Sequence, residues 1–217
     1  MRSISPLLAG LMALLLVLPA GVRAEVRLLA FGDSLVQGYG LPQGEGFVPQ
    51  LEARLRDGGH EVSVINAGVS GDTSAGGLSR IGWSLAEDVD AVIVVLGGND
   101  LLRGLDPGDT RENIGGILEE IRARGLPVLL AGMQAPGNYG AAYKEAFDGL
   151  YPALAEANGA RLFPSFMAPL MGDPEAPDLA AARALLQPDG VHPNAEGVAR
   201  IVEAMLPQVE AMLAEVE

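Results

Sequence analysis

The chain has 217 residues, of which 49% are hydrophobic, and its length suits one globular domain with a sizeable core. It has no cysteine, which excludes disulfides and thiolate metal sites. Its two histidines provide few ligands for a zinc site. The formal net charge of −14 disfavours binding to nucleic acid or anionic lipid, so we expect small-molecule partners and no nucleic acid.

The first 24 residues have the features of a secretory signal. Arg2 precedes an apolar run over residues 7–18, and Val22 and Ala24 occupy the −3 and −1 positions of a cleavage site. We expect cleavage after Ala24 and one mature domain over residues 25–217, located in a bacterial periplasm or outside the cell. The apolar run is shorter than the ~20 residues of a membrane span, and a lipoprotein would need a cysteine. We therefore expect no stable membrane insertion after cleavage. We also expect a monomer.

The mature part alternates predicted strands and helices. The predicted strands are 26–31, 62–66, 91–96, 127–133 and 161–163. The predicted helices are 46–57, 78–85, one from 109 or 110 to 124, 139–158, and a last helix that includes 198–213. Residues 91–96 form the most continuous apolar run, which predicts a central strand. This order predicts an α/β fold with a parallel sheet covered by helices on both faces. Pro152 and Pro207 are expected to kink their helices.

Glycine-containing segments follow each of the first three predicted strands, at residues 32–34, 68–72 and 97–100. Ligands of parallel sheets bind at the carboxyl ends of the strands, so we expect these segments to converge on one rim. Ser34 directly follows the first strand and is a candidate nucleophile. The alternative is a Gly-Asp-Ser turn without a chemical role, because these residues are favoured in turns for backbone reasons.

A serine nucleophile needs a base, and the base needs an orienting partner. His60 lies at the predicted amino end of the sheet, away from the rim, and is interpreted as a surface residue. His192 has Asp189 three residues before it and Gly190 between them, so the carboxylate can fold back and fix the histidine tautomer. The alternative is that this pair only caps or precedes the last helix. With no other base available, we predict a triad of Ser34, His192 and Asp189.

Attack by Ser34 on a carbonyl creates an oxyanion, which needs hydrogen-bond donors placed in advance. The candidates are the backbone N–H groups of Ser34 and Gly71 and the side-chain amide of Asn99. The alternatives are a plain loop glycine and a turn asparagine. The pattern is not the G-x-S-x-G nucleophile elbow of α/β-hydrolases, because position 36 is valine.

Four segments resemble the sequence blocks of the SGNH hydrolase superfamily: Phe31 to Leu35 (the GDSL block), 68–73, 97–100 and 189–193. The residues that name the superfamily fall on Ser34, Gly71, Asn99 and His192, and Asp189 matches the triad acid. The resemblance extends over essentially the whole mature chain. It is closest to the bacterial periplasmic arylesterase, acyl-CoA thioesterase and lysophospholipase type.

This resemblance implies a flavodoxin-like three-layer α/β/α sandwich with a parallel sheet of roughly five strands. It implies a serine esterase mechanism without metal or cofactor, acting through an acyl-enzyme on Ser34. The implied substrates are carboxylic esters and thioesters, including aryl esters, acyl-CoA and lysophospholipids. The resemblance does not determine which ester is physiological or which acyl length is preferred.

Apolar residues near the second and third blocks are candidates for binding an acyl chain. They are Leu78, Ile81, Trp83, Leu101, Leu102 and Leu105. The alternative is that they face the core, as apolar residues at helical spacing usually do. Asp72 is a further candidate for substrate binding.

Other functions remain open at this point. One is an esterase specialised for carbohydrate acetyl groups. Another is a metal-dependent, phosphatase-like enzyme with Mg²⁺ between Asp33, Asp72 and Asp100. A third is a non-catalytic carbohydrate or lipid binder on the same fold. We expect Asp33 to shape the turn that presents Ser34, and its further role is open.

Overall fold

The computed structural model describes residues 25–172 and 178–216, so the signal sequence predicted for residues 1–24 lies outside the described residues. Five strands form one sheet: β1 (Val26–Gly32), β2 (Val62–Gly68), β3 (Ala91–Val95), β4 (Val128–Ala131) and β5 (Arg161–Phe163). Their spatial order is β2-β1-β3-β4-β5, and every neighbouring pair is parallel. The predicted parallel sheet is thus confirmed, and β3 is buried along its whole length.

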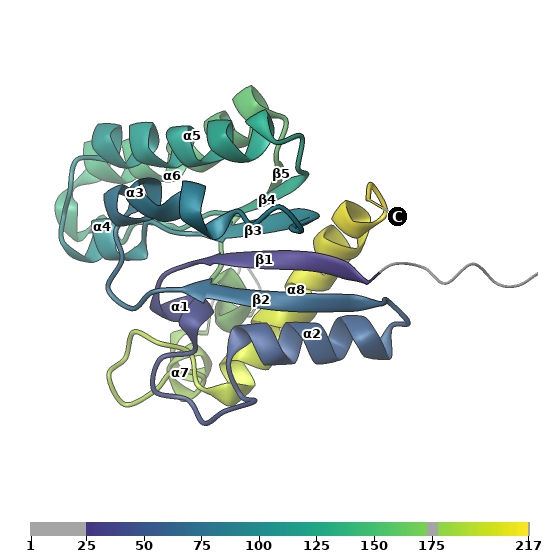
Figure 1. The fold of residues 1–217 in the computed structure, drawn as a ribbon. Helices are drawn as coiled ribbons and strands as arrows, with labels where there is room; N and C mark the ends of the chain where they lie inside the picture. Colours follow the sequence, from purple (N-terminus) through teal and green to yellow (C-terminus); the bar gives the residue numbers. More distant parts are fainter. Residues whose placement is uncertain (1–24, 173–177, 217) are drawn as a thin grey trace, which may run out of the picture.

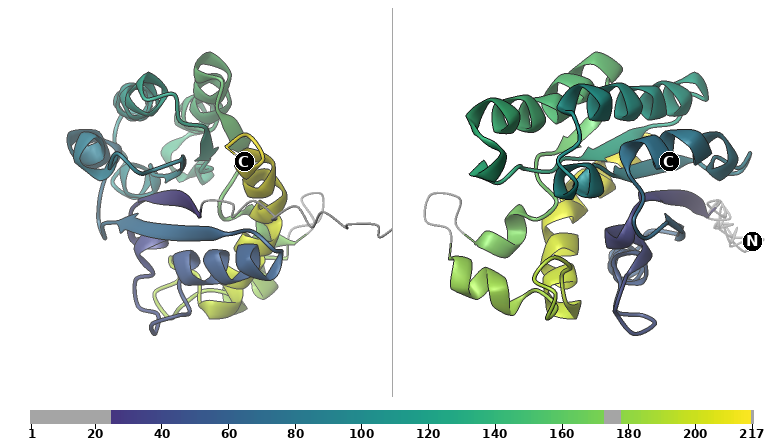
Figure 2. Two further views of the ribbon diagram at one scale, coloured as in Figure 1. Left: turned by 45° about the vertical axis from the view of Figure 1, so that its right-hand side comes forward. Right: turned by 90° about the vertical axis from the view of Figure 1, so that its left-hand side faces the viewer.

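Helices cover both faces of this sheet (Figure 1). One face carries α2 (Phe47–Asp57) and α8 (Ala195–Leu213), and the other carries α3 (Ser74–Ser84), α5 (Pro107–Ala123) and α6 (Ala141–Asn158). Figure 2 shows the two helical layers on either side of the strands. The predicted flavodoxin-like three-layer α/β/α architecture is therefore confirmed. The core consists of the apolar faces of these helices and the strands between them.

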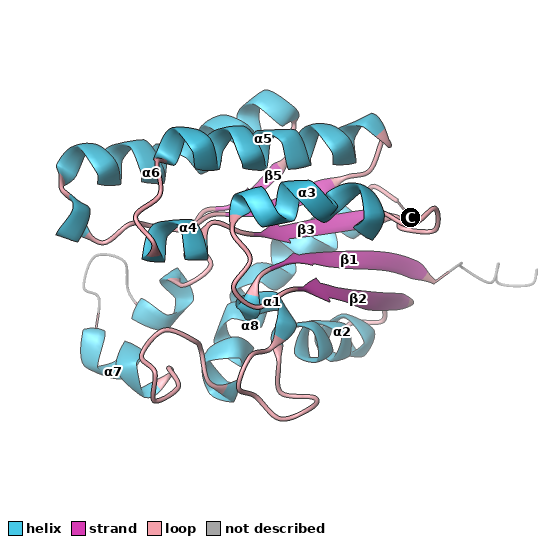
Figure 3. Cartoon of the chain, turned by 60° about the vertical axis from the view of Figure 1, so that its left-hand side comes forward, coloured by secondary structure: helices cyan, strands magenta, loops and turns pink. Residues whose placement is uncertain are grey.

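Short helical turns gather at the carboxyl ends of the strands (Figure 3). They are α1 (Ser34–Gln37), α4 (Gly98–Leu102), α7 (Leu179–Ala184) and the 3₁₀ turns η1 (Gly137–Tyr139) and η2 (Ala168–Met171). None of them was predicted, because a segment of three to six residues is too short to display helical periodicity. They form the rim on which the candidate site lies.

Two long helices begin earlier than predicted, and capping residues explain the difference. Helix α3 begins at Ser74 because the Thr73 hydroxyl accepts a hydrogen bond from the Gly76 N–H. Helix α5 begins at Pro107, where the missing N–H costs nothing, and Asp106 caps it.

Three further sequence predictions differ in detail or remain untested. Strand β4 ends at Ala131, two residues before its predicted end. Helices α6 and α8 continue through Pro152 and Pro207, so neither proline ends its helix.

Within residues 25–172 and 178–216, no helix combines the length and the apolar character that crossing a membrane requires.

Gly68 allows α1 to lie directly against the end of β2. A Cβ atom at this position would lie 2.2 Å from the Gln37 nitrogen and 2.8 Å from the Asp33 carbonyl oxygen. Only glycine permits such an approach of one backbone to another. Because α1 begins with Ser34, this contact helps to fix the position of the serine relative to the sheet.

Candidate active site

The candidate site lies where the strand order of the sheet reverses. From β1 the chain continues to β2 on one side, whereas β3 pairs with the other side of β1. In doubly wound sheets this reversal opens a crevice at the carboxyl ends of the strands. Ser34 follows β1, Asn99 lies in α4 after β3, and the loop that contains His192 reaches the same place from the start of α8.

Ser34, His192 and Asp189 form a continuous line of hydrogen bonds. Ser34 Oγ lies 2.8 Å from His192 Nε2, although the two residues are 158 positions apart. On the far side of the ring, His192 Nδ1 lies 2.7 Å from Asp189 Oδ2. With Nδ1 protonated and donating to the carboxylate, Nε2 is free to accept the serine proton.

Asp189 is held in its ionised form by donors close in sequence. Its Oδ1 accepts hydrogen bonds from the backbone N–H groups of Val191 at 2.9 Å and His192 at 3.0 Å. The Val191 N–H, the His192 ring and the His192 N–H together lower the pKa of Asp189 to about 2. Gly190, at φ +70°, provides the left-handed turn that folds this carboxylate back onto the histidine.

The loop that carries His192 is anchored to the segment after α1. The Gln187 amide donates to the backbone oxygens of Tyr39, at 2.8 Å, and Pro193, at 3.0 Å. The Tyr39 ring lies 4.8 Å from the His192 ring, between centroids. These contacts fix the imidazole relative to Ser34.

His60, by contrast, lies just before β2 at the amino end of the sheet, and its Nε2 is 4.0 Å from a carboxylate oxygen of Glu210 in α8.

The three candidate oxyanion donors differ in their surroundings. Asn99 Nδ2 donates one hydrogen bond to Asp33 Oδ2, at 3.2 Å, which leaves its second N–H available. Within the described ranges, the backbone N–H groups of Ser34 and Gly71 have no hydrogen-bond acceptor. Gly71 has φ +82°, and its carbonyl accepts a hydrogen bond from Arg103 Nη2 at 2.8 Å. Ser34 and Asn99 line the pocket described below, whereas Gly71 lies outside its lining.

Asp33 is a buried carboxyl group, with 1% of its surface exposed. Its Oδ1 accepts from the Leu35 N–H at 3.0 Å and so caps the turn that presents Ser34. Its Oδ2 holds the Asn99 amide. Burial raises the pKa of Asp33 to about 6, against the opposing effects of these two donors and of His192.

The other two carboxylates of the possible Mg²⁺ site have partners of their own. Asp72 Oδ2 accepts from Arg80 Nε at 2.6 Å, and Arg80 also bonds the Gly32 carbonyl at the end of β1. Asp100 is buried and accepts from the backbone and hydroxyl of Ser74 at 2.8 and 2.5 Å. Among the residues that the structure describes, no three acidic or histidine side chains are grouped as metal ligands.

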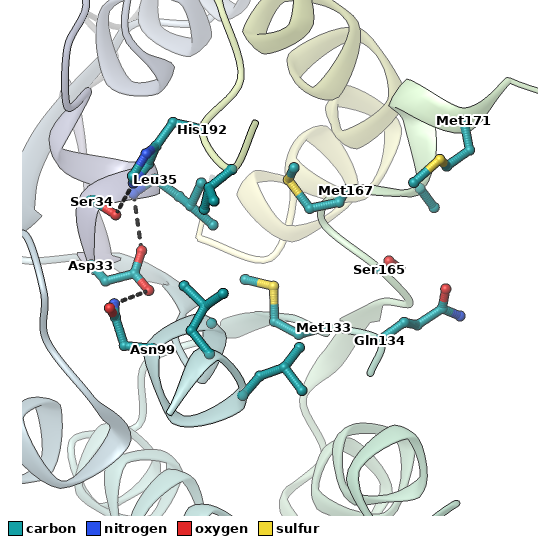
Figure 4. Close-up of a pocket in the computed structure, with 15 residues that line it drawn as sticks. Asp33, Ser34, Leu35, Asn99, Met133, Gln134, Ser165, Met167, Met171 and His192 are labelled. Carbon is teal, nitrogen blue, oxygen red and sulfur yellow. Dashed lines mark hydrogen bonds between the residues drawn. The ribbon is translucent and has the colours of Figure 1, made fainter. Parts of the chain in front are cut away.

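A pocket of about 260 Å³ opens beside Ser34 and is mainly apolar (Figure 4). Its lining comes from the ends of β1, β3, β4 and β5 and from the His192 loop. The lining residues are Asp33, Ser34, Leu35, Gly98, Asn99, Leu101, Leu102, Met133, Gln134, Ser165, Met167, Ala168, Met171, Val191 and His192.

The pocket lining includes only part of the set predicted for substrate binding. Leu101 and Leu102 belong to it, but Leu78, Leu105 and Asp72 do not. The Leu78 side chain packs over Gly116 of α5. Two other predicted residues also lie elsewhere, because Ile81 is buried in the core and Trp83 is 92% exposed.

The sequence prediction missed the three methionines of the lining, Met133, Met167 and Met171. They follow β4 and β5, whose carboxyl ends reach the same rim as those of β1 and β3. The rule that placed the first three segments at this rim would have included them. The prediction applied that rule only to the segments after the first three strands, and it placed Met133 at the end of the fourth predicted strand, 127–133.

Comparisons with known proteins agree with this geometry. The GDSL-like Lipase/Acylhydrolase family matches residues 30–200. Esterase TesA of Pseudomonas aeruginosa is 39% identical over 208 residues, which cover 95% of this chain and 98% of TesA. Thioesterase 1/protease 1/lysophospholipase L1 of Escherichia coli K12 is 35% identical over 187 residues, which cover 86% of this chain and 84% of the Escherichia coli protein. The crystal structure of AlinE4, an SGNH-hydrolase family esterase, has 47% identity and a TM-score of 0.69, covering 88% of this chain and 98% of AlinE4.

Proposed function

The chain belongs to the GDSL-like Lipase/Acylhydrolase family, and on this premise we propose that Ser34, His192 and Asp189 are its catalytic triad. The protein is a serine hydrolase that acts on ester bonds. The observation that carries the proposal is the pair of hydrogen bonds, 2.8 and 2.7 Å long, that joins the serine hydroxyl through the imidazole to the carboxylate.

The reaction proceeds through an acyl-enzyme. Ser34 Oγ attacks the ester carbonyl carbon while His192 Nε2 takes the hydroxyl proton, and the carbonyl electron pair moves onto oxygen. The tetrahedral intermediate then collapses, and His192 returns the proton to the departing alcohol or thiol. Water attacks the acyl-enzyme with His192 again as base, which releases the carboxylic acid and restores Ser34. Asp189 stays ionised throughout and stabilises the imidazolium.

The oxyanion receives hydrogen bonds from the Ser34 N–H, the Gly71 N–H and the second N–H of Asn99. Support for these roles comes from their lack of other acceptors among the described residues and from the position of Ser34 and Asn99 at the pocket. Loss of one such donor typically lowers kcat by about 10²- to 10³-fold. No metal or cofactor takes part in this scheme.

The substrates are small esters and thioesters with an acyl or aryl group, such as aryl esters, acyl-CoA and lysophospholipids. The apolar lining of the pocket supports this class over carbohydrate acetyl esters. The names of the relatives, which include thioesterase and lysophospholipase, support it as well.

The protein acts as a secreted or periplasmic monomer after loss of a signal sequence. Support comes from the pattern of residues 1–24, with Val22 and Ala24 before the cleavage point. The mature domain then begins at Glu25. Intact mass measurement of the protein exported from a bacterial host tests this boundary.

A substrate panel tests the proposed function. Purified mature protein is assayed with p-nitrophenyl butyrate, an acyl-CoA and a lysophospholipid, beside Ser34→Ala and the matched control Ser63→Ala. Ser63 lies near the amino end of β2, far from the rim. We expect Ser34→Ala to lose on the order of 10⁴-fold or more in kcat, while Ser63→Ala behaves as wild type. Normal turnover by folded Ser34→Ala on all three substrates would refute the assignment.

A further inference from the structure

We propose that Ser165 forms a polar subsite at the end of the pocket opposite Ser34, and that this subsite selects acyl groups that carry a hydroxyl far from the ester carbonyl. The inference rests on the proposed function, because it names the acyl class that the same pocket accepts. It concerns a residue that has no part in the chemistry at Ser34.

Ser165 follows β5 and is almost fully enclosed. Only 5% of its surface is exposed, and it lines the pocket. Its hydroxyl forms no side-chain hydrogen bond with the described residues, and it is not among their fully enclosed polar atoms that lack a partner, so we infer that it is open to the pocket. A hydroxyl that faces a pocket without a protein partner is free to bond water or a polar group of the occupant.

The surroundings of Ser165 make its hydroxyl distinctive. The middle of the pocket is apolar, with the Met133 and Met167 side chains between Ser34 on one side and Ser165 on the other (Figure 4). Gln134 lies at the same end as Ser165, and its amide supplies both donors and an acceptor. An acyl chain therefore passes flexible thioethers first and meets polar groups only at its far end.

A plain alkyl chain that filled this pocket would cover the Ser165 hydroxyl and leave it without a partner. Such an unpaired group weakens binding, whereas a hydroxyl on the chain at the same depth would donate or accept a hydrogen bond. A site that hydrogen-bonds a substrate hydroxyl discriminates strongly against the analogue that lacks this hydroxyl. An apolar pocket discriminates only weakly against a ligand that carries an extra hydroxyl. The pocket should therefore favour the hydroxylated chain.

The sheet topology indicates where on the chain this hydroxyl lies. Ser34 follows β1 and Ser165 follows β5, and these strands are three positions apart in the sheet. Three spacings of ~4.8 Å separate the two residues by roughly 14 Å. The hydrogen bond to Ser165 takes up about 2.8 Å of this distance. An extended alkyl chain with C–C bonds of ~1.5 Å advances about 1.3 Å per carbon, so the hydroxyl belongs about eight or nine carbons from the ester carbonyl.

The test compares p-nitrophenyl esters of decanoic, 9-hydroxydecanoic and 3-hydroxydecanoic acid on wild type, Ser165→Ala and the control Ser63→Ala. We expect Ser165→Ala to lower the ratio of kcat/KM for the 9-hydroxy ester over the plain ester by about tenfold. The ratio for the 3-hydroxy ester should not change, because that hydroxyl lies near Ser34. Ser63→Ala should leave both ratios at their wild-type values.

A second readout separates this inference from the proposed function. Binding of decanoic and 9-hydroxydecanoic acid to Ser34→Ala, with and without Ser165→Ala, is measured by calorimetry. A tighter Kd for the hydroxy acid that is lost with Ser165→Ala supports the subsite even if Ser34 proves not to be the nucleophile. Ratios of kcat/KM and of Kd that are unaffected by Ser165→Ala overturn the subsite, whatever the outcome for Ser34.

Discussion

Two aspartates near Ser34 have opposite electrostatic environments. Asp189 is partly exposed and accepts hydrogen bonds from two backbone N–H groups and the His192 ring, which lower its pKa to about 2. Asp33 is buried, and desolvation raises its pKa to about 6. Environment alone thus separates one carboxylate that remains charged from one that titrates near neutrality. The charged one contacts the proposed base, and the other caps the turn of the nucleophile.

Replacement of Asp189 tests the orienting role. Asp189→Asn presents a neutral amide that can also donate to His192 Nδ1, so the imidazole loses both the negative charge and the tautomer preference that the carboxylate provides. We expect kcat for a p-nitrophenyl ester to fall by about 10³- to 10⁴-fold with little change in KM. Asp109→Asn, at the exposed start of α5, serves as the matched control. A loss below tenfold in Asp189→Asn would remove this residue from the triad.

The raised pKa of Asp33 predicts a pH dependence of stability. Between pH 4 and 6 the unfolded chain releases this proton while the folded protein retains it, so the free energy of unfolding falls as the pH rises through this range. A shift from 3.8 to about 6 corresponds to a loss on the order of 3 kcal/mol by pH 7.

Asp33→Asn removes this titration, so we expect its stability to change less between pH 4 and 7 than that of wild type. Urea denaturation at pH 4, 5, 6 and 7 measures both profiles. Parallel profiles for the two proteins would show that Asp33 is not buried with a raised pKa. Because Asn99 loses a charged acceptor, we also expect a lower kcat in this variant.

At the scale of elements, the sequence predicted the strands well and the rim incompletely. The strands are apolar runs bounded by glycine or polar residues, and that signal is local. The turn from Asp189 to His192 was predicted because its geometry is also local: a carboxylate, a glycine and an imidazole within four residues. The contact between Ser34 and His192 was inferred by elimination, since no other histidine lay at the rim.

Other parts of the site depend on contacts that a single sequence does not encode locally. Leu78 was predicted to bind substrate, but Gly116 makes room for it on α5. Ser165 had no motif around it, and its importance appears only once β5 is placed beside β4. The second partner of Asp33, Asn99, is 66 positions away. Packing between elements decides each of these cases.

Gly68 provides a test of how an element positions the nucleophile. A Cβ at this position would overlap the backbone of α1 at Gln37, so Gly68→Ala must displace the turn that carries Ser34. We expect a loss of about 1–3 kcal/mol in unfolding free energy and a clear decrease in kcat. The control is Gly149→Ala in α6, where a Cβ meets no atom within 4 Å. That variant should be stabilised by about 0.5–1 kcal/mol with unchanged kcat. Equal behaviour of the two variants would contradict this account.

At the scale of the whole molecule, charge is the property that the sequence determines most directly. Removal of residues 1–24 takes away two arginines and no acid, which leaves 12 basic and 28 acidic residues and a net charge of −16. Such a field opposes the approach of anionic substrates and is screened by salt over a Debye length of about 10 Å at 0.1 M. The electrostatic effect should therefore depend on the charge of the substrate.

This predicts different salt responses for two substrate types. Between 10 and 200 mM NaCl, kcat/KM for an anionic acyl-CoA should rise by about two- to tenfold, while that for a neutral aryl ester with the same acyl group stays constant. Initial rates at low substrate concentration measure both. A kcat/KM for acyl-CoA that falls with salt would reveal a local basic approach to the pocket and contradict the prediction.

The central claim, that Ser34 is the nucleophile activated by His192, is tested most directly by covalent trapping. Wild type, Ser34→Ala and Ser63→Ala are treated with a p-nitrophenyl alkylphosphonate, and the released p-nitrophenol and the mass of each protein are measured. The account predicts one equivalent of p-nitrophenol and one phosphonyl group, located on Ser34, in wild type and Ser63→Ala, with no adduct in Ser34→Ala. A stoichiometric adduct on Ser34→Ala, or on any residue of wild type other than Ser34, would contradict it.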